Sequence, residues 1–191
     1  MSGLAGSNNS RSGIVGGKYS AGEVVQKKHL VTNTKQSTTH VSNDTWYEAN
    51  TGYRVAITPK FANSRIEVEY YIPFNQHSAA NILTLFKFFR LITGGSKGYN
   101  LTSLGTDNGQ ISGDRHGIAG SSFRPCGFDQ QDSDFYSGMA MDFPNTNLET
   151  FYGFETKPQG TNTTTWGYSV GTSSDWGWKA AIMITATEIK V

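Results

Sequence analysis

The residue types that most often carry catalysis or bind metal ions are few and scattered in this sequence. There are four histidines: His29, His40, His77 and His116. No two of them have the short spacing at which a single element presents zinc ligands. Asp114 and His116 flank Arg115, but neighbouring residues on a strand point to opposite faces, so this triplet is not a site by itself. Glycine-rich phosphate-binding motifs and the HExxH zinc motif are also missing from the sequence.

Two further candidates are weak for physical reasons. The single cysteine, Cys126, lies in RPCG, which resembles no nucleophile signature. The acidic segment 129–134 offers Asp129, Asp132 and Asp134 as oxygen ligands for Ca²⁺, but it lacks the glycine and the distal glutamate of a calcium-binding loop. A solvated turn is the simpler reading. We therefore predict a protein that is not an enzyme and that needs no metal ion or cofactor.

Aromatic residues near the C-terminus suggest a different chemistry. Four large rings occur in a span rich in glycine, serine and threonine: Trp166, Tyr168, Trp176 and Trp178. Flat rings beside small polar side chains are typical of a surface that stacks on sugars, so this span is a candidate glycan-binding site. The preferred alternative is that the rings fill the core or a subunit interface.

The composition indicates which kind of secondary structure must position any such site. The chain has 191 residues, 22 of them glycine, and only 16% are charged, which favours short strands and tight turns over helices. Net charge is +1, so we expect neither nucleic-acid binding nor an anionic membrane as partner. No apolar segment is long enough to cross a membrane as a helix, and the first residues lack the apolar core of a secretory signal.

Alternating apolar and polar residues predict several strands. In residues 53–58 and 65–72 every second residue is apolar, and the polar segment between them reads as a turn. Residues 135–143 and 148–156 also alternate, and they read as a hairpin. The chain closes on a strand within residues 178–191. Eight or nine strands without a confident helix predict an all-β, antiparallel two-sheet sandwich, most simply a jelly roll, with an immunoglobulin-like sandwich as the alternative.

Residues 82–92 form the most apolar stretch of the chain. A strand with apolar residues on both faces fits this stretch better than a helix, because Thr93, Gly94 and Gly95 follow it. Such a strand is expected either at a subunit interface or in the centre of a monomer. The interface reading assigns the contact to six residues: Leu83, Leu85, Phe86, Phe88, Phe89 and Leu91.

The chain divides into two parts on composition. Residues 23–191 contain the strands of the sandwich, whereas residues 1–22 are rich in glycine, serine and asparagine and cannot bury enough surface to fold alone. This segment is either a disordered tail or an extended arm that docks on a partner. In the docking reading its apolar contacts are Leu4, Ile14 and Val15.

Three stretches resemble structural proteins encoded by marine tailed phages: GEVVQ at 22–26, TGYRVAITPKFANSRIEVEYYI at 51–72 and AAIMITATEIKV at 180–191. The glycine-rich opening SGLAGSNNSRSGIVGGK is similar to the N-terminal segments of those proteins. The resemblance covers about a third of the chain and includes no catalytic residue.

The resemblance implies a virion structural protein that is assembled in the host cytoplasm. It implies a homotrimer that contacts other virion proteins through the N-terminal arm. A tail fibre or spike used in host attachment is the expected role, and a host-surface glycan is one possible ligand. A capsid decoration protein and a stand-alone carbohydrate-binding module remain as alternatives.

Overall fold

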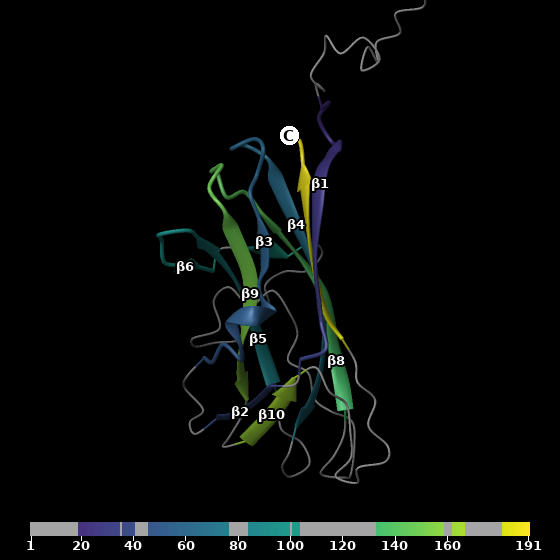
Figure 1. Cartoon of the computed structure of the whole chain (residues 1–191), viewed down its shortest axis with the longest axis vertical. Helices are drawn as coiled ribbons and strands as arrows, with labels where there is room; N and C mark the ends of the chain where they lie inside the picture. Colours follow the sequence, from purple (N-terminus) through teal and green to yellow (C-terminus); the bar gives the residue numbers. More distant parts are fainter. Residues whose placement is uncertain are drawn as a thin grey trace, which may run out of the picture.

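The computed structural model describes residues 19–34, 36–40, 46–76, 84–99, 101–103, 133–158, 162–166 and 181–191. These residues form eleven strands and one short 3-10 turn, and every strand pair is antiparallel. The strands make two sheets that pack face to face (Figure 1). The predicted all-β sandwich is therefore confirmed.

The larger sheet, sheet A, has seven strands: β1 (Val24–Thr32), β2 (Gln36–His40), β4 (Arg65–Gln76), β7 (Thr102–Ser103), β8 (Ser133–Asp142), β10 (Asn162–Trp166) and β11 (Ile182–Ile189). Its central strand is β4. The first half of β4 pairs with β11, its last residues pair with β10, and β8 follows its other edge for ten residues. Strand β1 lies beyond β11.

The smaller sheet, sheet B, has four strands in the order β3-β9-β5-β6. They are β3 (Val55–Ile57), β5 (Thr84–Ile92), β6 (Lys97–Gly98) and β9 (Thr150–Pro158). The 3-10 turn Thr51–Tyr53 precedes β3, and the Asn50 side chain caps it by accepting a hydrogen bond from the Gly52 amide at 2.7 Å.

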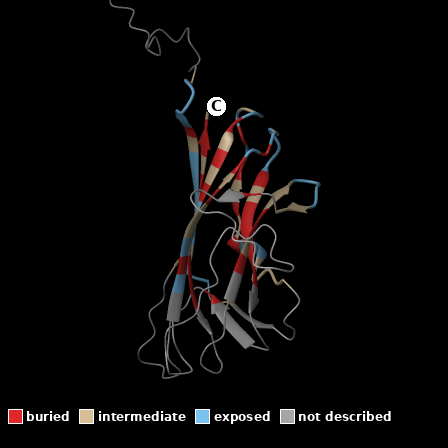
Figure 2. Cartoon of the chain, turned by 180° about the vertical axis from the view of Figure 1, so that it is seen from behind, coloured by how far each residue is buried: buried red, intermediate tan, exposed pale blue. Residues whose placement is uncertain are grey.

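The core lies between the sheets, and Figure 2 shows buried residues along strands of both sheets. The predicted inward residues of the strands are buried: Val55, Ile57, Ile66, Val68, Tyr70, Ile72, Ile182, Ile184 and Ala186. Aromatic rings from the two sheets meet directly. The Tyr70 and Phe88 ring centroids lie 4.0 Å apart, and those of Phe86 and Tyr136 lie 4.7 Å apart. Stacked aromatic pairs therefore hold the layers together.

The two expected hairpins are wrong in the same way. The strands predicted in residues 53–58 and 65–72 do not pair, because β3 belongs to sheet B and β4 to sheet A. Strands β8 and β9, predicted as a hairpin, also lie in different sheets. In both cases the connection crosses from one layer to the other, so the apolar faces of the two strands meet across the core instead of side by side.

Strand β5 runs inside the molecule. Phe86 and Phe88 point into the core and are fully buried within a single chain. Phe89 points to the outer face of sheet B, yet it is fully buried as well. The predicted subunit contact therefore does not include these three rings. The alternative reading of this stretch, a buried central strand, describes them.

Phe89 is buried because its own chain covers it. The Lys97 ammonium lies 4.4 Å from the centroid of the Phe89 ring, and the Arg54 guanidinium carbon lies 5.5 Å from it. Across the neighbouring strand, Gly153 leaves room for the ring. A Cβ at this position would lie 2.7 Å from the Phe89 Cζ and 3.2 Å from the Arg54 Cγ.

We predict that Gly153→Ala destabilises the fold by about 1–3 kcal/mol, because the added methyl group must displace the Phe89 ring. Urea denaturation followed by tryptophan fluorescence measures the change. Gly98→Ala is the matched control, since a Cβ there comes no closer than 3.4 Å to a flexible Arg90 atom. Equal stabilities of the two variants would contradict the role of Gly153.

Candidate interaction surface

The outer face of sheet A carries an ordered pattern of side chains. Strand register aligns outward-facing residues of β1, β11, β4 and β8 in rows. In order along the strands the rows are Lys27–Thr187–Glu67–Met141, His29–Thr185–Glu69–Met139, Val31–Met183–Tyr71–Ser137 and Pro73–Phe135. We call the six polar residues on β1, β11 and β4 in the first two rows the polar belt.

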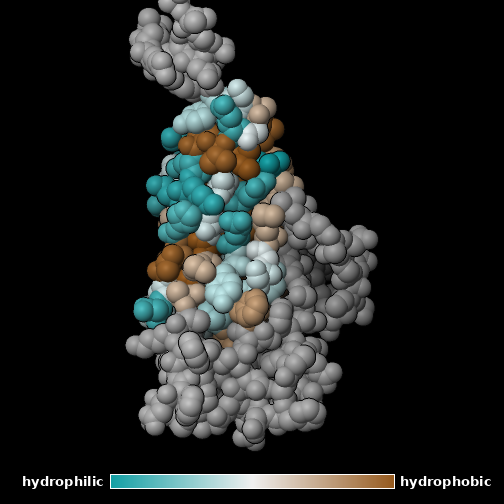
Figure 3. Space-filling model, turned by 90° about the vertical axis from the view of Figure 1, so that its right-hand side faces the viewer, coloured by the Kyte–Doolittle hydropathy of each residue, from teal (hydrophilic) through white to brown (hydrophobic). Residues whose placement is uncertain are grey.

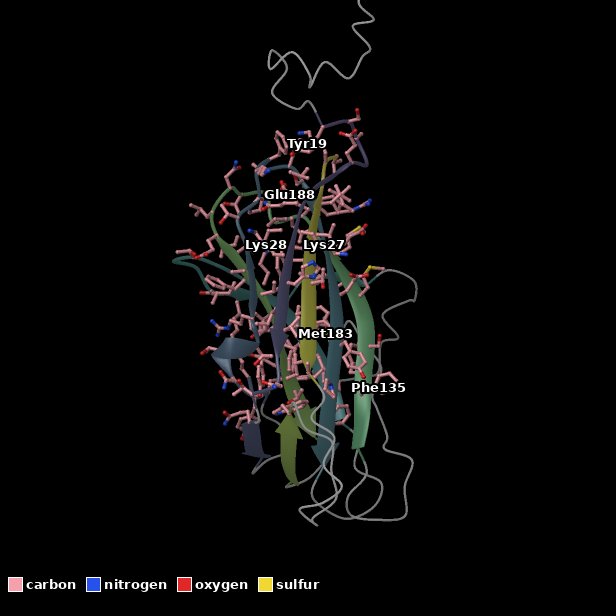
Figure 4. The ribbon with its side chains drawn as sticks, turned by 45° about the vertical axis from the view of Figure 1, so that its right-hand side comes forward. Tyr19, Lys27, Lys28, Phe135, Met183 and Glu188 are labelled. Atoms are coloured by element: carbon pink, nitrogen blue, oxygen red, sulfur yellow. The ribbon has the colours of Figure 1, made fainter. Side chains whose placement is uncertain are left out.

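Large apolar side chains lie on one side of this belt, and we call Val31, Met183, Tyr71 and Phe135 the lower apolar zone. Val31 is 64% exposed, Phe135 49% and Met183 43%. The Tyr71 and Phe135 rings stack with centroids 5.5 Å apart. Figure 4 shows Met183 and Phe135 below Lys27 on the same face. Contiguous exposed apolar side chains of this size are typical of interaction surfaces.

A second apolar area lies at the other side of the belt. Val24 and Ile189 share a row with Arg65, and Phe143 follows the end of β8. We call the exposed Val24 and Phe143, together with the buried Ile189, the upper apolar zone. Figure 3 shows hydrophobic areas above and below the hydrophilic belt. The face therefore combines two apolar zones with a charged belt. Protein interfaces likewise combine an apolar core with polar parts.

Within the belt, the pair between Lys27 and Glu69 is loose. Lys27 Nζ lies 3.9 Å from Glu69 Oε2, and both side chains are about half exposed. Such a pair contributes roughly 0–1 kcal/mol. Arg65 contacts Glu67 at 2.8 Å. The basic residues Lys27 and His29 stand on β1, whereas Glu67 and Glu69 stand two strands away on β4, so the belt has a basic side and an acidic side.

The outer face of sheet B differs, because its charges are closely paired. Glu48 receives hydrogen bonds from Arg54 and from Lys97, and Lys97 also contacts Glu155 at 2.6 Å. Burial alone would raise the pKa of the Glu48 carboxyl, but the hydrogen bonds and charges of Arg54 and Lys97 lower it overall. This cluster covers Phe89 and leaves little unpaired charge.

Two buried carboxylates lie inside the sandwich. Asp142 accepts a hydrogen bond from Tyr152 at 2.8 Å and pairs with Arg90 at 2.7 Å. Burial, with the Asp142 charge, raises the pKa of Tyr152 well above its usual range, so its hydroxyl stays a donor. This group joins β8 of sheet A to β5 and β9 of sheet B. Because Asp142 comes from one sheet and both of its partners come from the other, this group links the two layers.

Glu188 is the second buried carboxylate. It accepts hydrogen bonds from the backbone amides of Lys60 and Phe61 at 2.9 and 3.1 Å, and from the Ser64 hydroxyl at 2.7 Å. Gln26 donates to its other oxygen at 2.6 Å. Burial would raise the pKa of this carboxyl, but these hydrogen bonds lower it overall. The carboxylate thus holds the crossing between β3 and β4.

The predicted glycan-binding residues have different outcomes. Trp166 is fully buried, and its ring packs 5.6 Å from that of Phe154 and 5.7 Å from that of Phe74. It belongs to the core and cannot stack on a sugar, as the alternative reading expected. The other three rings, Tyr168, Trp176 and Trp178, lie outside the described residues.

The remaining predicted residues can be located as follows. Leu4, Ile14, Val15 and Leu83 lie outside the described residues. The Leu85 backbone belongs to β5, while Leu91 is half-buried on the outer face of sheet B. His29 is exposed on β1 with its Nδ1 3.0 Å from the Thr185 hydroxyl. Within the described ranges, no three histidine, cysteine, aspartate or glutamate side chains come together in a way that could hold a metal ion.

The outer face of sheet A was missed as a site, although part of the signal was present. The alternation in residues 135–143 puts Phe135, Met139 and Met141 on one face. We would have assigned these apolar residues to the core, but the core face of β8 carries Tyr136, Ala140 and Asp142. Val31, Tyr71 and Met183 gave no signal, since each is a single large residue on the polar side of its strand.

Comparison with known proteins gives no family for this chain: no protein-family model matches it, and neither does any curated protein. Among the described residues there is no helix of the length and hydrophobicity that a membrane span requires.

We predict that Glu188→Gln lowers the free energy of unfolding at pH 7 by roughly 1.5–3 kcal/mol, because charge-assisted hydrogen bonds are lost. Since folding lowers the pKa of Glu188, the stability it supplies is present above its ordinary pKa of 4.5 and disappears as the pH falls through the folded value. Urea titrations between pH 7 and pH 3 should therefore show wild type and variant converging at the acid end. A constant difference would contradict the assignment.

Proposed function

We propose that this chain is a non-enzymatic structural protein of a tailed-phage particle. In this proposal it docks through its N-terminal segment, assembles as a homotrimer and contributes to a tail fibre or spike that contacts the host. The resemblance in the sequence suggests the class. The structural observation that carries the proposal is the position of Tyr19, where the described chain begins, at one end of the sandwich.

The start of the described chain is anchored on the sandwich. The Tyr19 ring packs against Phe61 edge-on at 5.9 Å, and the Lys60 ammonium lies 5.8 Å from the Tyr19 centroid. The Gly22 amide donates to the Lys190 carbonyl at 2.7 Å, and the Lys190 amide donates to the Glu23 carbonyl at 3.0 Å. Tyr19, the first described residue, is thus already anchored, a few residues before the expected boundary at residue 23, and this fixes where residues 1–18 join the sandwich.

This point lies at the same end of the sandwich as the C-terminal strand (Figure 1). Strands β2 and β10 lie at the opposite end, where β10 pairs with the last residues of β4. The strand ends that border segments 77–83 and 159–161 belong to this far end too, since Thr84 pairs with Pro158 there. An attachment segment at one end and chain connections at the other suit a protein that is fixed to a particle and presents its far end to the surroundings.

The same arrangement supports a capsid decoration protein, for which the particle-bound end would face the head instead of the tail. The structure also leaves the glycan-binding reading with Tyr168, Trp176 and Trp178 alone, because Trp166 belongs to the core. In these two alternatives the chain contacts the head of the particle or a glycan instead of the tail, so one experiment on particles separates them from the proposal.

We predict that deletion of residues 1–18 leaves the thermal unfolding midpoint within about 2 °C of wild type, because Tyr19, Gly22 and Glu23 keep their own contacts with the sandwich. The same deletion should abolish incorporation into particles of the virus that encodes the chain. Mass spectrometry of purified particles measures incorporation, and gold-labelled antibody in electron microscopy locates the full-length chain. Absence of the full-length chain from particles would refute the proposal, whereas label on the head would favour decoration over a tail fibre.

A further inference from the structure

We propose that copies of this chain associate through the outer face of sheet A, about an axis parallel to the strands. This inference specifies the self-assembly that forms part of the proposed function. It replaces the subunit contact expected from residues 82–92, where the phenylalanine rings are covered by their own chain. The occupant of the face is a second copy of the chain.

The exposed apolar surface supplies the first argument. On the described part of the outer face of sheet B, paired charged side chains cover Phe89. On the outer face of sheet A, by contrast, Val31, Met183 and Phe135 stay exposed. Methionine and aromatic residues are enriched at the centres of protein interfaces, and Met139, Met141 and Tyr71 extend the same surface. Burial of a large apolar side chain contributes favourably in any such contact.

The charge pattern supplies the second argument and selects the partner. Suppose that two copies pack face to face about a twofold axis that runs along β11. Each row then faces the same row of the other copy, with the β1 residue of one copy opposite the β4 residue of the other. Lys27 meets Glu67, His29 meets Glu69, and Val31 meets Tyr71, while Met183 meets Met183 on the axis. Lys27 thus meets an acidic residue in the belt, the His29 imidazole can donate a hydrogen bond to Glu69, and apolar residues meet outside the belt.

An axis that crosses the strands gives the opposite result. The β1 residues of one copy would then face the β1 residues of the other, so Lys27 and His29 would meet basic residues, and Glu67 would meet an acidic one. Juxtaposed like charges in an interface are costly. A threefold axis parallel to the strands also keeps the rows level and brings the basic β1 side of each copy towards the next copy. The strand-parallel axis is therefore the common feature of both closed assemblies.

The mass of the full chain in solution gives the first test. Multi-angle light scattering after size-exclusion chromatography, at tens of micromolar, should give two or three times the chain mass of 20.9 kDa. Met183→Glu should shift the protein to the mass of one chain while its circular dichroism spectrum and unfolding midpoint remain, because this side chain is exposed in the single chain. Leu148→Glu is the matched control, an exposed leucine outside this face, and should leave the mass unchanged.

A charge exchange between two chains tests the partner and the axis. Lys27→Glu and Glu67→Lys should each raise the dissociation constant roughly tenfold or more, because each creates like-charge contacts between copies. Mixing the two variants should restore association in complexes that contain both, since each altered residue then meets an opposite charge. Only contacts between chains can be restored in this way, and the weak pair within one chain cannot.

Several outcomes would overturn the inference. A single-chain mass for the wild type would show that another partner or a segment of the same chain covers the face. An unchanged oligomer in the Met183→Glu variant would assign assembly to another surface. Mixing without any restoration would refute the strand-parallel axis. None of these results depends on particle incorporation, so the proposed function fails or stands on its own experiment.

Discussion

One buried carboxylate holds the crossing on which the sandwich depends. Glu188 is the second-to-last residue of strand β11. Its carboxylate accepts hydrogen bonds from the backbone amides of residues 60 and 61 and from Ser64, where the chain passes from sheet B to sheet A. Gln26 extends the contact to β1, and its amide also donates to the Thr58 carbonyl at 2.7 Å. One ionised side chain therefore satisfies amides that a layer-crossing segment leaves without strand partners. It also sets β3 opposite β4 across the core.

The two outer faces of the sandwich differ in how far their large apolar side chains are covered. Each sheet carries large residues on its outer side. Sheet B encloses Phe89 between Gly153, Arg54 and Lys97, whereas sheet A leaves Val31, Met183 and Phe135 exposed to solvent. The charges of sheet B stand within one cluster and satisfy each other. Those of sheet A stand on separate strands: Lys27 lies on β1, whereas Glu67 and Glu69 lie on β4, where Arg65 pairs with Glu67.

The sequence predicts which residues alternate, but not always which face is buried or which strands pair. Period-two patterns identified the inward residues of β3, β4 and β11, because there the apolar face is the core face. They failed for β8, where Asp142 is buried with Arg90 and Tyr152, and where Gly138 leaves room for the Tyr136 ring. Two successive strands show the same alternation whether they form a hairpin or lie in different layers. The placement of β3 and β4 in different sheets depends on the distant Glu188, which the local pattern does not include. The surface site was unpredictable for a similar reason, since its rows combine residues from four strands.

The proposed axis and the proposed attachment constrain each other. An axis parallel to the strands places the Tyr19 ends of all copies on the same side of the assembly, and the β2 and β10 ends on the other. An axis across the strands would send the N-terminal segments in opposite directions, and only some of them could reach one particle surface. The charge pattern of the belt excludes that second case by electrostatic repulsion. The charges on sheet A and the anchored start of the chain thus both fit the proposed assembly, in which all copies attach by the same end.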